Sequence, residues 1–248
     1  MVKVDPMYDA ERVIQDERLL QHPKLSECPE YIRSDFVRKV YALLSLQLLL
    51  TASVTTVFTL HAPTREWVLR ERGGYMAALF AGLAFLVALG CYKNRYPLNA
   101  VLLVGFTACE SYSVGAVSAI YYAQGLGVLV VWAGGMTTVI FAALTAYVWI
   151  TRKDLRFLES GLFIGLLTLL GVGLLLLVIG PVPLLNGFLA VAGTLLFCGY
   201  ILYDTSSLML TLGPDDAIIG AVQLYLDIIN LFLYLLELLR CLVGNSAD

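Results

Sequence analysis

The fold is decided by one stretch, residues 184–239, which reads LLNGFLAVAGTLLFCGYILYDTSSLMLTLGPDDAIIGAVQLYLDIINLFLYLLELL. Two long apolar segments in it flank a short polar sequence from Leu212 to Asp216. Glycine can end a helix, proline cannot continue one and aspartate can cap the next, so the polar sequence predicts the turn of a helical hairpin. Each apolar segment carries one aspartate within it, Asp204 in the first and Asp227 in the second.

The two aspartates are expected at the same depth in a membrane. Asp204 lies nine residues before Gly213, and Asp227 lies eleven residues after Asp216. At about 1.5 Å per helical residue, each is roughly 14 to 17 Å from the turn, and half of a ~30 Å hydrocarbon core is about 15 Å. A carboxylate there costs at least ~2.5 kcal/mol and usually marks an ion or substrate path. The hairpin therefore predicts two carboxyls facing each other near the middle of the membrane.

Composition indicates an all-α integral membrane protein. Of the 248 residues, 59% are hydrophobic and 14% are charged, whereas about a quarter are charged in soluble domains. Gln223, Asp227, Asn230 and Glu237 interrupt the last apolar segment, so we expect that helix at the centre of the bundle, away from lipid. We expect seven membrane-spanning helices, over residues 40–60, 75–92, 98–121, 127–150, 158–179, 184–203 or a little beyond, and 217–239.

Basic residues predict the orientation of the chain. Of the 16 Lys and Arg residues, most fall in the N-terminal region and in the loops around 93–95 and 152–156, which would all lie on the cytosolic side. We expect a cytosolic tail over residues 1–35 without a cleavable signal peptide, a single transmembrane domain over 36–242 and a short tail over 243–248. The C-terminus is expected on the lumenal or external side, or in the cytosol if the last segment is re-entrant.

Amide side chains accompany the second aspartate on its helix. Asn230 follows Asp227 by three residues and Gln223 precedes it by four, so all three share one face. Oxygen ligands of this kind suit a hard cation such as Ca²⁺. Two acids and a few amides predict a weak, partly hydrated Ca²⁺ site at Asp204 and Asp227 on a permeation path, and no tightly bound cofactor. Mg²⁺, Na⁺ and H⁺ are alternatives that the residues leave open.

Other charged residues have more than one interpretation. Arg95, in a loop on the side of the hairpin turn, is either the counter-charge of the aspartates or a positive anchor at the membrane surface. Glu110, within the third expected span, is either a supporting polar contact or a pore residue. Glu237 and Arg240 are expected to pair at the membrane boundary. Because the spans contain no histidine, any response to pH would have to run through buried carboxyls.

Five motifs occur in order along the chain: IRSDFVRKVY (32–41), YPLN (96–99), KDLRFL (153–158), YILYD (200–204) and LYLDIINLF (224–232). From about residue 32 to 242 they resemble the transmembrane Bax inhibitor motif family, especially its Lifeguard branch. The resemblance implies seven helices with the last at the centre and a pH-sensitive calcium leak. It also implies that Asp204 and Asp227 form a di-aspartyl sensor and that Arg95 is the latch that pairs with an aspartate in the closed state. In eukaryotic members it implies suppression of cell death and lowering of stored calcium.

The function that we predict is a pH-sensitive calcium leak channel of an intracellular membrane, the endoplasmic reticulum or Golgi, with the plasma membrane as an alternative. Expected partners are the lipid bilayer, Ca²⁺ and other membrane proteins of cell-death or calcium-release pathways, and nothing suggests nucleic acid. The main alternative is a non-conducting regulator that binds other membrane proteins, in which the acids only lock the fold. An intramembrane aspartyl protease also needs two aspartates, but Asp227 lacks a glycine-flanked motif, so we expect no enzyme and assign no catalytic residue.

Overall fold

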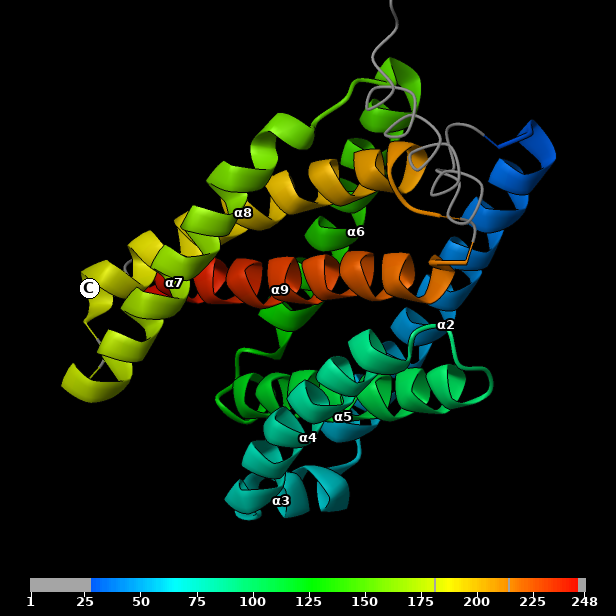
Figure 1. The fold of residues 1–248 in the computed structure, drawn as a ribbon. Coiled ribbons are helices and arrows are strands. Elements are labelled where there is room, and N and C mark those ends of the chain that lie inside the picture. Colours follow the sequence, from blue (N-terminus) through cyan, green and yellow to red (C-terminus); the bar gives the residue numbers. More distant parts are fainter. Residues whose placement is uncertain (1–27, 181, 214, 245–248) are drawn as a thin grey trace, which may run out of the picture.

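The computed structural model describes residues 28–180, 182–213 and 215–244, and these fold into helices without a strand (Figure 1). A 3-10 turn, η2 (Arg156–Leu158), precedes one of the long helices. The helices are α2 (Glu30–Leu60), α3 (Ala62–Arg70), α4 (Arg72–Tyr92), α5 (Leu98–Ala123), α6 (Gly127–Thr151), α7 (Glu159–Ile179), α8 (Pro183–Leu210) and α9 (Ala217–Gly244).

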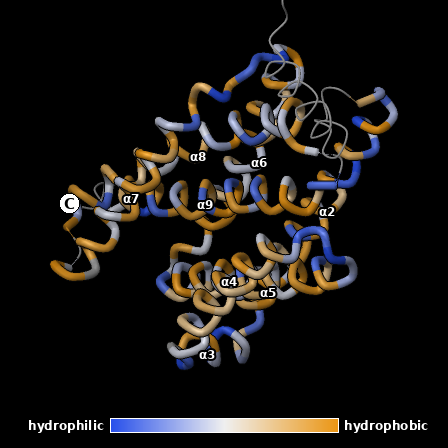
Figure 2. Tube along the Cα trace, in the orientation of Figure 1, coloured by the Kyte–Doolittle hydropathy of each residue, from blue (hydrophilic) through white to orange (hydrophobic). Residues whose placement is uncertain are grey.

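Six of these helices are long and apolar enough to cross a membrane: α2, α4, α5, α6, α7 with η2, and α8. They correspond to the first six expected spans. Helix α9 is not among them, so the structure supports six of the seven spans that we expected. Figure 2 shows hydrophilic residues mostly at turns and helix ends, whereas α9 carries several within its length.

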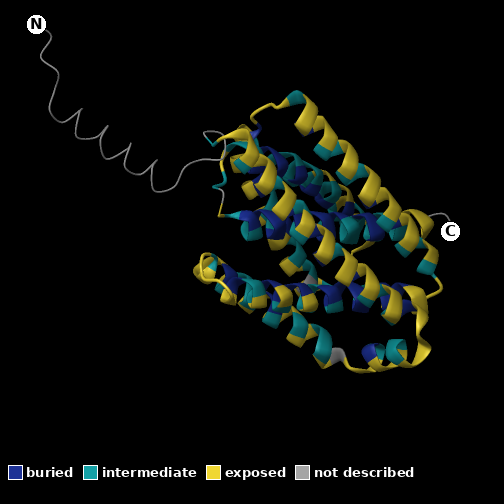
Figure 3. Cartoon of the chain, turned by 90° about the vertical axis from the view of Figure 1, so that its right-hand side faces the viewer, coloured by how far each residue is buried: buried dark blue, intermediate teal, exposed yellow. Residues whose placement is uncertain are grey.

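Helix α9 packs against α8, α6, α2 and α5 and crosses the middle of the view in Figure 1. Two clusters of buried apolar residues meet on it. One joins α9 to α2 and α5, and includes Phe36, Val40 and Phe106. The other joins it to α6 and α8, and includes Ala133 and Ile201. Figure 3 shows buried positions concentrated on the inner helices, while the outer helices expose large apolar side chains, as expected of a surface solvated by lipid.

Several helices extend beyond the expected spans. Helix α2 begins at Glu30, inside the expected N-terminal tail, and α8 continues to Leu210. The short helix α3 was not expected at all. Hydropathy marks only the apolar part of a helix, and polar turns that continue the same backbone hydrogen bonding leave no hydropathy signal. Residues 1–27 and 245–248 of the expected tails lie outside the described residues.

The turn between α8 and α9 is held by Asp216. The Asp216 carboxylate accepts a hydrogen bond from the Gly213 N–H (3.2 Å). The backbone carbonyl of Asp216 accepts a hydrogen bond from the Gly220 N–H (3.0 Å). Lys93, in the loop after α4, donates to the same carboxylate at 2.8 Å. The predicted helical hairpin is therefore confirmed, and an ion pair ties it to the neighbouring loop.

Lys93→Met is expected to lower the free energy of unfolding by less than about 1 kcal/mol, because partly exposed ion pairs contribute little. The lysine side chain is 43% exposed. Asp216→Ala is expected to cost more, since it also removes the acceptor of the Gly213 N–H. Unfolding of the purified protein in detergent micelles measures both variants. Equal losses would contradict the role given to Asp216 in the turn.

The loop after α6 is tied to α8 by one serine. Ser206 Oγ donates to the Lys153 carbonyl (3.1 Å) and accepts from the Leu155 N–H (3.2 Å). Within the loop, the Asp154 carboxylate accepts hydrogen bonds from the side chain and backbone of Arg156, which lower the pKa of Asp154 to about 2. These contacts place the loop against the last turns of α8.

Candidate functional site

Helices α8 and α9 bring together Asp204 and Asp227. Both side chains are buried, with 6% and 4% of their residue surfaces exposed, and the two carboxyls lie close enough for each to affect the protonation of the other. An ionised carboxylate only accepts hydrogen bonds, so a hydrogen bond between two carboxyls requires a proton on one of them. A hydrogen bond can therefore join the two carboxyls only while they share a proton.

The surroundings of the pair leave hydrogen-bonding capacity unused. Asp227 Oδ2 is buried without a hydrogen-bond partner among the described residues, and so is Thr205 Oγ1 next to Asp204. Tyr200 interacts electrostatically with both aspartates, and Tyr203 with Asp204. An unsatisfied buried acceptor costs about 1 to 3 kcal/mol. Such a cost is typical of a site that takes up a further proton, a water molecule or a cation.

Two glycines allow α8 and α9 to approach closely on either side of the pair. A Cβ atom on Gly193 of α8 would overlap the ring of Tyr234 on α9. A Cβ atom on Gly220 of α9 would lie 2.5 Å from a methyl group of Leu208 on α8. Because Tyr234 packs directly on the backbone of Gly193, and Leu208 on that of Gly220, the two helices come closer at these points than residues with a Cβ atom would allow.

A second polar cluster lies on another face of α9, between α2 and α5. Gln47 Nε2 donates to Thr107 Oγ1 (3.1 Å). Thr51 Oγ1 lies 2.9 Å from Ser111 Oγ and 2.8 Å from the Tyr225 hydroxyl. None of these residues was predicted to belong to the site. A signal was present, since Gln47 and Thr51 on one helix, and Thr107 and Ser111 on the other, are each four residues apart and share a face.

The other predicted residues do not join the aspartates. The guanidinium of Arg95 lies over the Tyr92 ring, 5.4 Å from its centre, and among the described residues Arg95 forms no ion pair. The interpretation of Arg95 as counter-charge therefore has no contact to support it in this state. Glu110 lies on α5 against Gly82 of α4, away from the pair.

The amides of α9 are also directed elsewhere. Asn230 donates to the backbone carbonyl of Leu226 (2.8 Å), and Gln223 is half-buried without a hydrogen bond to either aspartate among the described residues. The ion pair of Glu237 with Arg240 is confirmed. Tyr121 on α5 donates to the same glutamate at 2.8 Å. Helix α9 is thus held at its C-terminal end by a third polar contact.

The sequence model of the family described as "Inhibitor of apoptosis-promoting Bax1" matches residues 33–243. The chain belongs to the Bax inhibitor family. It is 40% identical to Protein lifeguard 4 of Mus musculus over 210 residues, which cover 85% of the chain and 86% of that protein. It is 39% identical to the Golgi anti-apoptotic protein of Vaccinia virus (strain Lister), with the same coverage. Bax inhibitor 1 of Schizosaccharomyces pombe is 33% identical over 224 residues, 90% of the chain and 83% of that protein.

This member of the Bax inhibitor family offers few ligands for a cation. In the part of the chain that the structure describes, no three His, Cys, Asp or Glu side chains gather in a way that could hold a metal ion. Asp204 and Asp227 supply two carboxyls, whereas Ca²⁺ is coordinated by about 6 to 8 oxygen atoms at distances of about 2.3 to 2.6 Å. Water or backbone carbonyls would have to supply the rest, which is the chemistry of a weak site.

Tyr225→Phe is expected to lower the free energy of unfolding by about 0.5 to 1.5 kcal/mol, because it removes one buried hydrogen bond to Thr51. Tyr234→Phe is the matched control, since Tyr234 lies on the same helix and its described contact is made by the ring, which stacks on Phe197. Denaturant unfolding in micelles compares the two. Equal stability of the two variants would mean that the polar cluster contributes nothing to the packing of α9.

Proposed function

We propose that the chain forms a pH-responsive calcium leak in an intracellular membrane, and that it suppresses cell death by lowering stored calcium. The observation that carries the proposal is the buried Asp204–Asp227 pair between α8 and α9. The name of the vaccinia relative, Golgi anti-apoptotic protein, supports the role in cell death and a Golgi location.

The proposed mechanism rests on the protonation state of the pair. With one shared proton the hydrogen bond is charge-assisted, and such bonds are roughly twice as strong as neutral ones. A second proton, taken up in acid, leaves a weaker neutral contact, so α8 and α9 separate more easily and the leak increases. Loss of the last proton leaves two negative charges in contact, which repel each other or draw in a cation.

In this proposal α9 spans the membrane as a seventh, central helix. Its contacts with α2, α5, α6 and α8 support that position, because a helix that carries Asp227 and Asn230 is costly against lipid. The N-terminus would be cytosolic, and the location the endoplasmic reticulum or Golgi. The role is not enzymatic, and other membrane proteins of cell-death or calcium-release pathways would be its partners.

A non-conducting regulator is the second candidate. It is favoured by the burial of both carboxyls, which leaves the pair little access to solvent in this state. In that case the aspartates would only fasten α8 to α9, and the chain would act by binding other membrane proteins.

Flux through the purified protein distinguishes the two candidates. Liposomes loaded with a calcium indicator, with and without the protein, are exposed to external Ca²⁺ in neutral and in acidic buffer. A leak channel is expected to give protein-dependent indicator signal that rises on acidification. Signal equal to that of empty liposomes at both pH values would leave the regulator as the function of the chain.

A further inference from the structure

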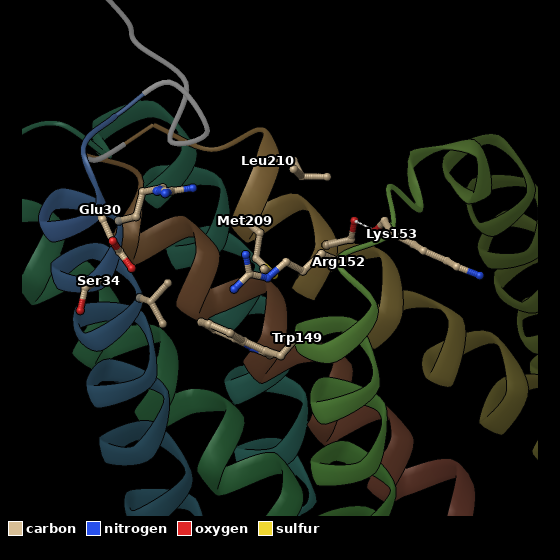
Figure 4. A pocket seen from close by; sticks show the side chains of 10 residues that line it. Glu30, Ser34, Trp149, Arg152, Lys153, Met209 and Leu210 are labelled. Carbon is tan, nitrogen blue, oxygen red and sulfur yellow. Dashed lines mark hydrogen bonds between the residues drawn. The ribbon is translucent and has the colours of Figure 1, made fainter.

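A pocket of about 390 Å³ lies where the start of α2 meets the ends of α6 and α8 (Figure 4). Its walls come from all three helices and from the loop after α6. Neither Asp204 nor Asp227 lines it. Because α2, α6 and α8 are candidate membrane spans, a pocket at their ends lies at one boundary of the bilayer. It is therefore separate from the site proposed for calcium.

One part of the pocket is positively charged. Arg33, Arg152 and Lys153 line it, against the single acid Glu30. Among the described residues, none of the three basic side chains forms an ion pair. Figure 4 shows the Arg152 side chain directed toward Trp149, while the Lys153 side chain extends away from Trp149. Two arginines without an acidic partner predict an anionic ligand that accepts several hydrogen bonds, as a phosphate does.

The backbone at Arg152 strengthens this interpretation. Arg152 ends α6 in the left-handed conformation, with φ 49° and ψ 30°. This conformation is uncommon for residues other than glycine and costs about 1 to 2 kcal/mol. A glycine would end the helix at lower cost. The arginine side chain at this position therefore has a use beyond ending the helix.

The other part of the pocket is apolar. Val37, Trp149 and Met209 line it. The indole N–H of Trp149 donates to the Tyr41 hydroxyl at 3.3 Å, and Trp and Tyr are enriched at the boundary between membrane and water. The next residue, Ile150, is 81% exposed, which places lipid-facing surface directly beside the pocket. A ligand that satisfies both parts carries a negative charge on an apolar body.

We propose that this pocket binds a membrane phospholipid through an anionic headgroup, with phosphate oxygens between Arg33 and Arg152 and the acyl chains passing Trp149. A free phosphate would use only the basic part and leave the apolar walls without a partner. The proposal does not depend on calcium conduction, so it can fail or hold independently of the proposed leak.

Native mass spectrometry of the full-length protein released from detergent micelles tests the proposal. The probes are phosphatidylinositol phosphate, phosphatidylcholine and soluble inositol phosphate, each titrated separately. The protein is expected to bind phosphatidylinositol phosphate more tightly than either of the other two. Arg33→Gln and Arg152→Gln are each expected to weaken this binding roughly fivefold, the ratio that corresponds to about 1 kcal/mol per basic residue near anionic lipid.

The matched control is Lys39→Gln, which removes the same charge from the exposed surface of α2 but not from the pocket. Its affinity for phosphatidylinositol phosphate is expected to equal that of the unmodified protein. If Lys39→Gln weakened binding as much as Arg33→Gln, attraction would be spread over the surface and the pocket would be excluded as the site. Equal affinity for inositol phosphate and the lipid would overturn the assignment to a membrane lipid. Arg33 is exposed, so its replacement leaves the fold intact even if Arg152→Gln does not.

Discussion

Asp227→Asn is expected to give calcium flux that changes less between neutral and acidic buffer than the flux of the unmodified protein. In the unmodified chain, the contact between Asp204 and Asp227 needs a shared proton, so its strength depends on pH. An asparagine amide donates to a carboxylate without any added proton. The variant therefore keeps a contact between α8 and α9 without a shared proton, and only the Asp204 carboxyl still titrates, so the pH response is reduced. Liposome flux at two pH values measures this directly.

The control for this prediction is Asp215→Asn, which removes an exposed carboxyl from the turn between the same two helices. Its flux is expected to respond to pH like that of the unmodified protein. Asp204→Asn is expected to behave like Asp227→Asn, because either amide can replace the shared proton. Unchanged flux and unchanged pH dependence in both pair variants would refute the role of the aspartates as the sensor.

Gly193→Ala is expected to lower the free energy of unfolding by about 1 to 3 kcal/mol, the usual cost of adding volume to a packed contact. The added methyl group would overlap the Tyr234 ring of α9. That ring cannot move freely, because it stacks on Phe197 with 5.7 Å between the ring centres. The variant must therefore shift α8 away from α9 at a point about three helical turns from Asp204.

Gly187→Ala provides the comparison on the same helix. Apart from its chain neighbours and the backbone of its own helix, no heavy atom of the described residues lies within 4 Å of the Cβ position at Gly187. Alanine is favoured over glycine in a helix by up to about 1 kcal/mol, so this variant is expected to be as stable as the unmodified protein or slightly more stable. Thermal or denaturant unfolding in micelles measures both. A loss of stability at Gly187 equal to that at Gly193 would mean that helix contact is not the cause.

The hairpin and its aspartates could be predicted from sequence because their signals are strong. A carboxylate in an apolar segment differs in polarity from all of its neighbours. Gly213 is followed by a proline, and a Gly-Pro sequence ends a helix. Helix α3 gave no comparable signal, since it is short and not apolar. The ends of α2 and α8 were misplaced for the same reason, because hydropathy falls off before the backbone hydrogen bonding ends.

The partners of the pair were harder to predict than the pair itself. Asn230 shares a helix face with Asp227, but its amide bonds to the backbone of its own helix, a choice of rotamer that spacing does not determine. Arg95 stacks on Tyr92 through a loop whose conformation no periodicity describes. The cluster around Thr51 went unnoticed because hydroxyl and amide groups change hydropathy little, although four such residues repeat at helical spacing.

The spacing of Tyr225 and Asp227 has a consequence for movement within the molecule. Because they are two residues apart on α9, their side chains leave the helix in directions about 160° apart. Tyr225 is fastened to α2 and Asp227 to α8. A rotation of α9 about its axis that breaks the contact of Tyr225 with α2 also displaces Asp227 from α8, and the reverse holds as well. The packing of α8 on α9 is therefore coupled to the packing of α2 on α9. A change in protonation that weakens the contact with α8 also alters the contact with α2.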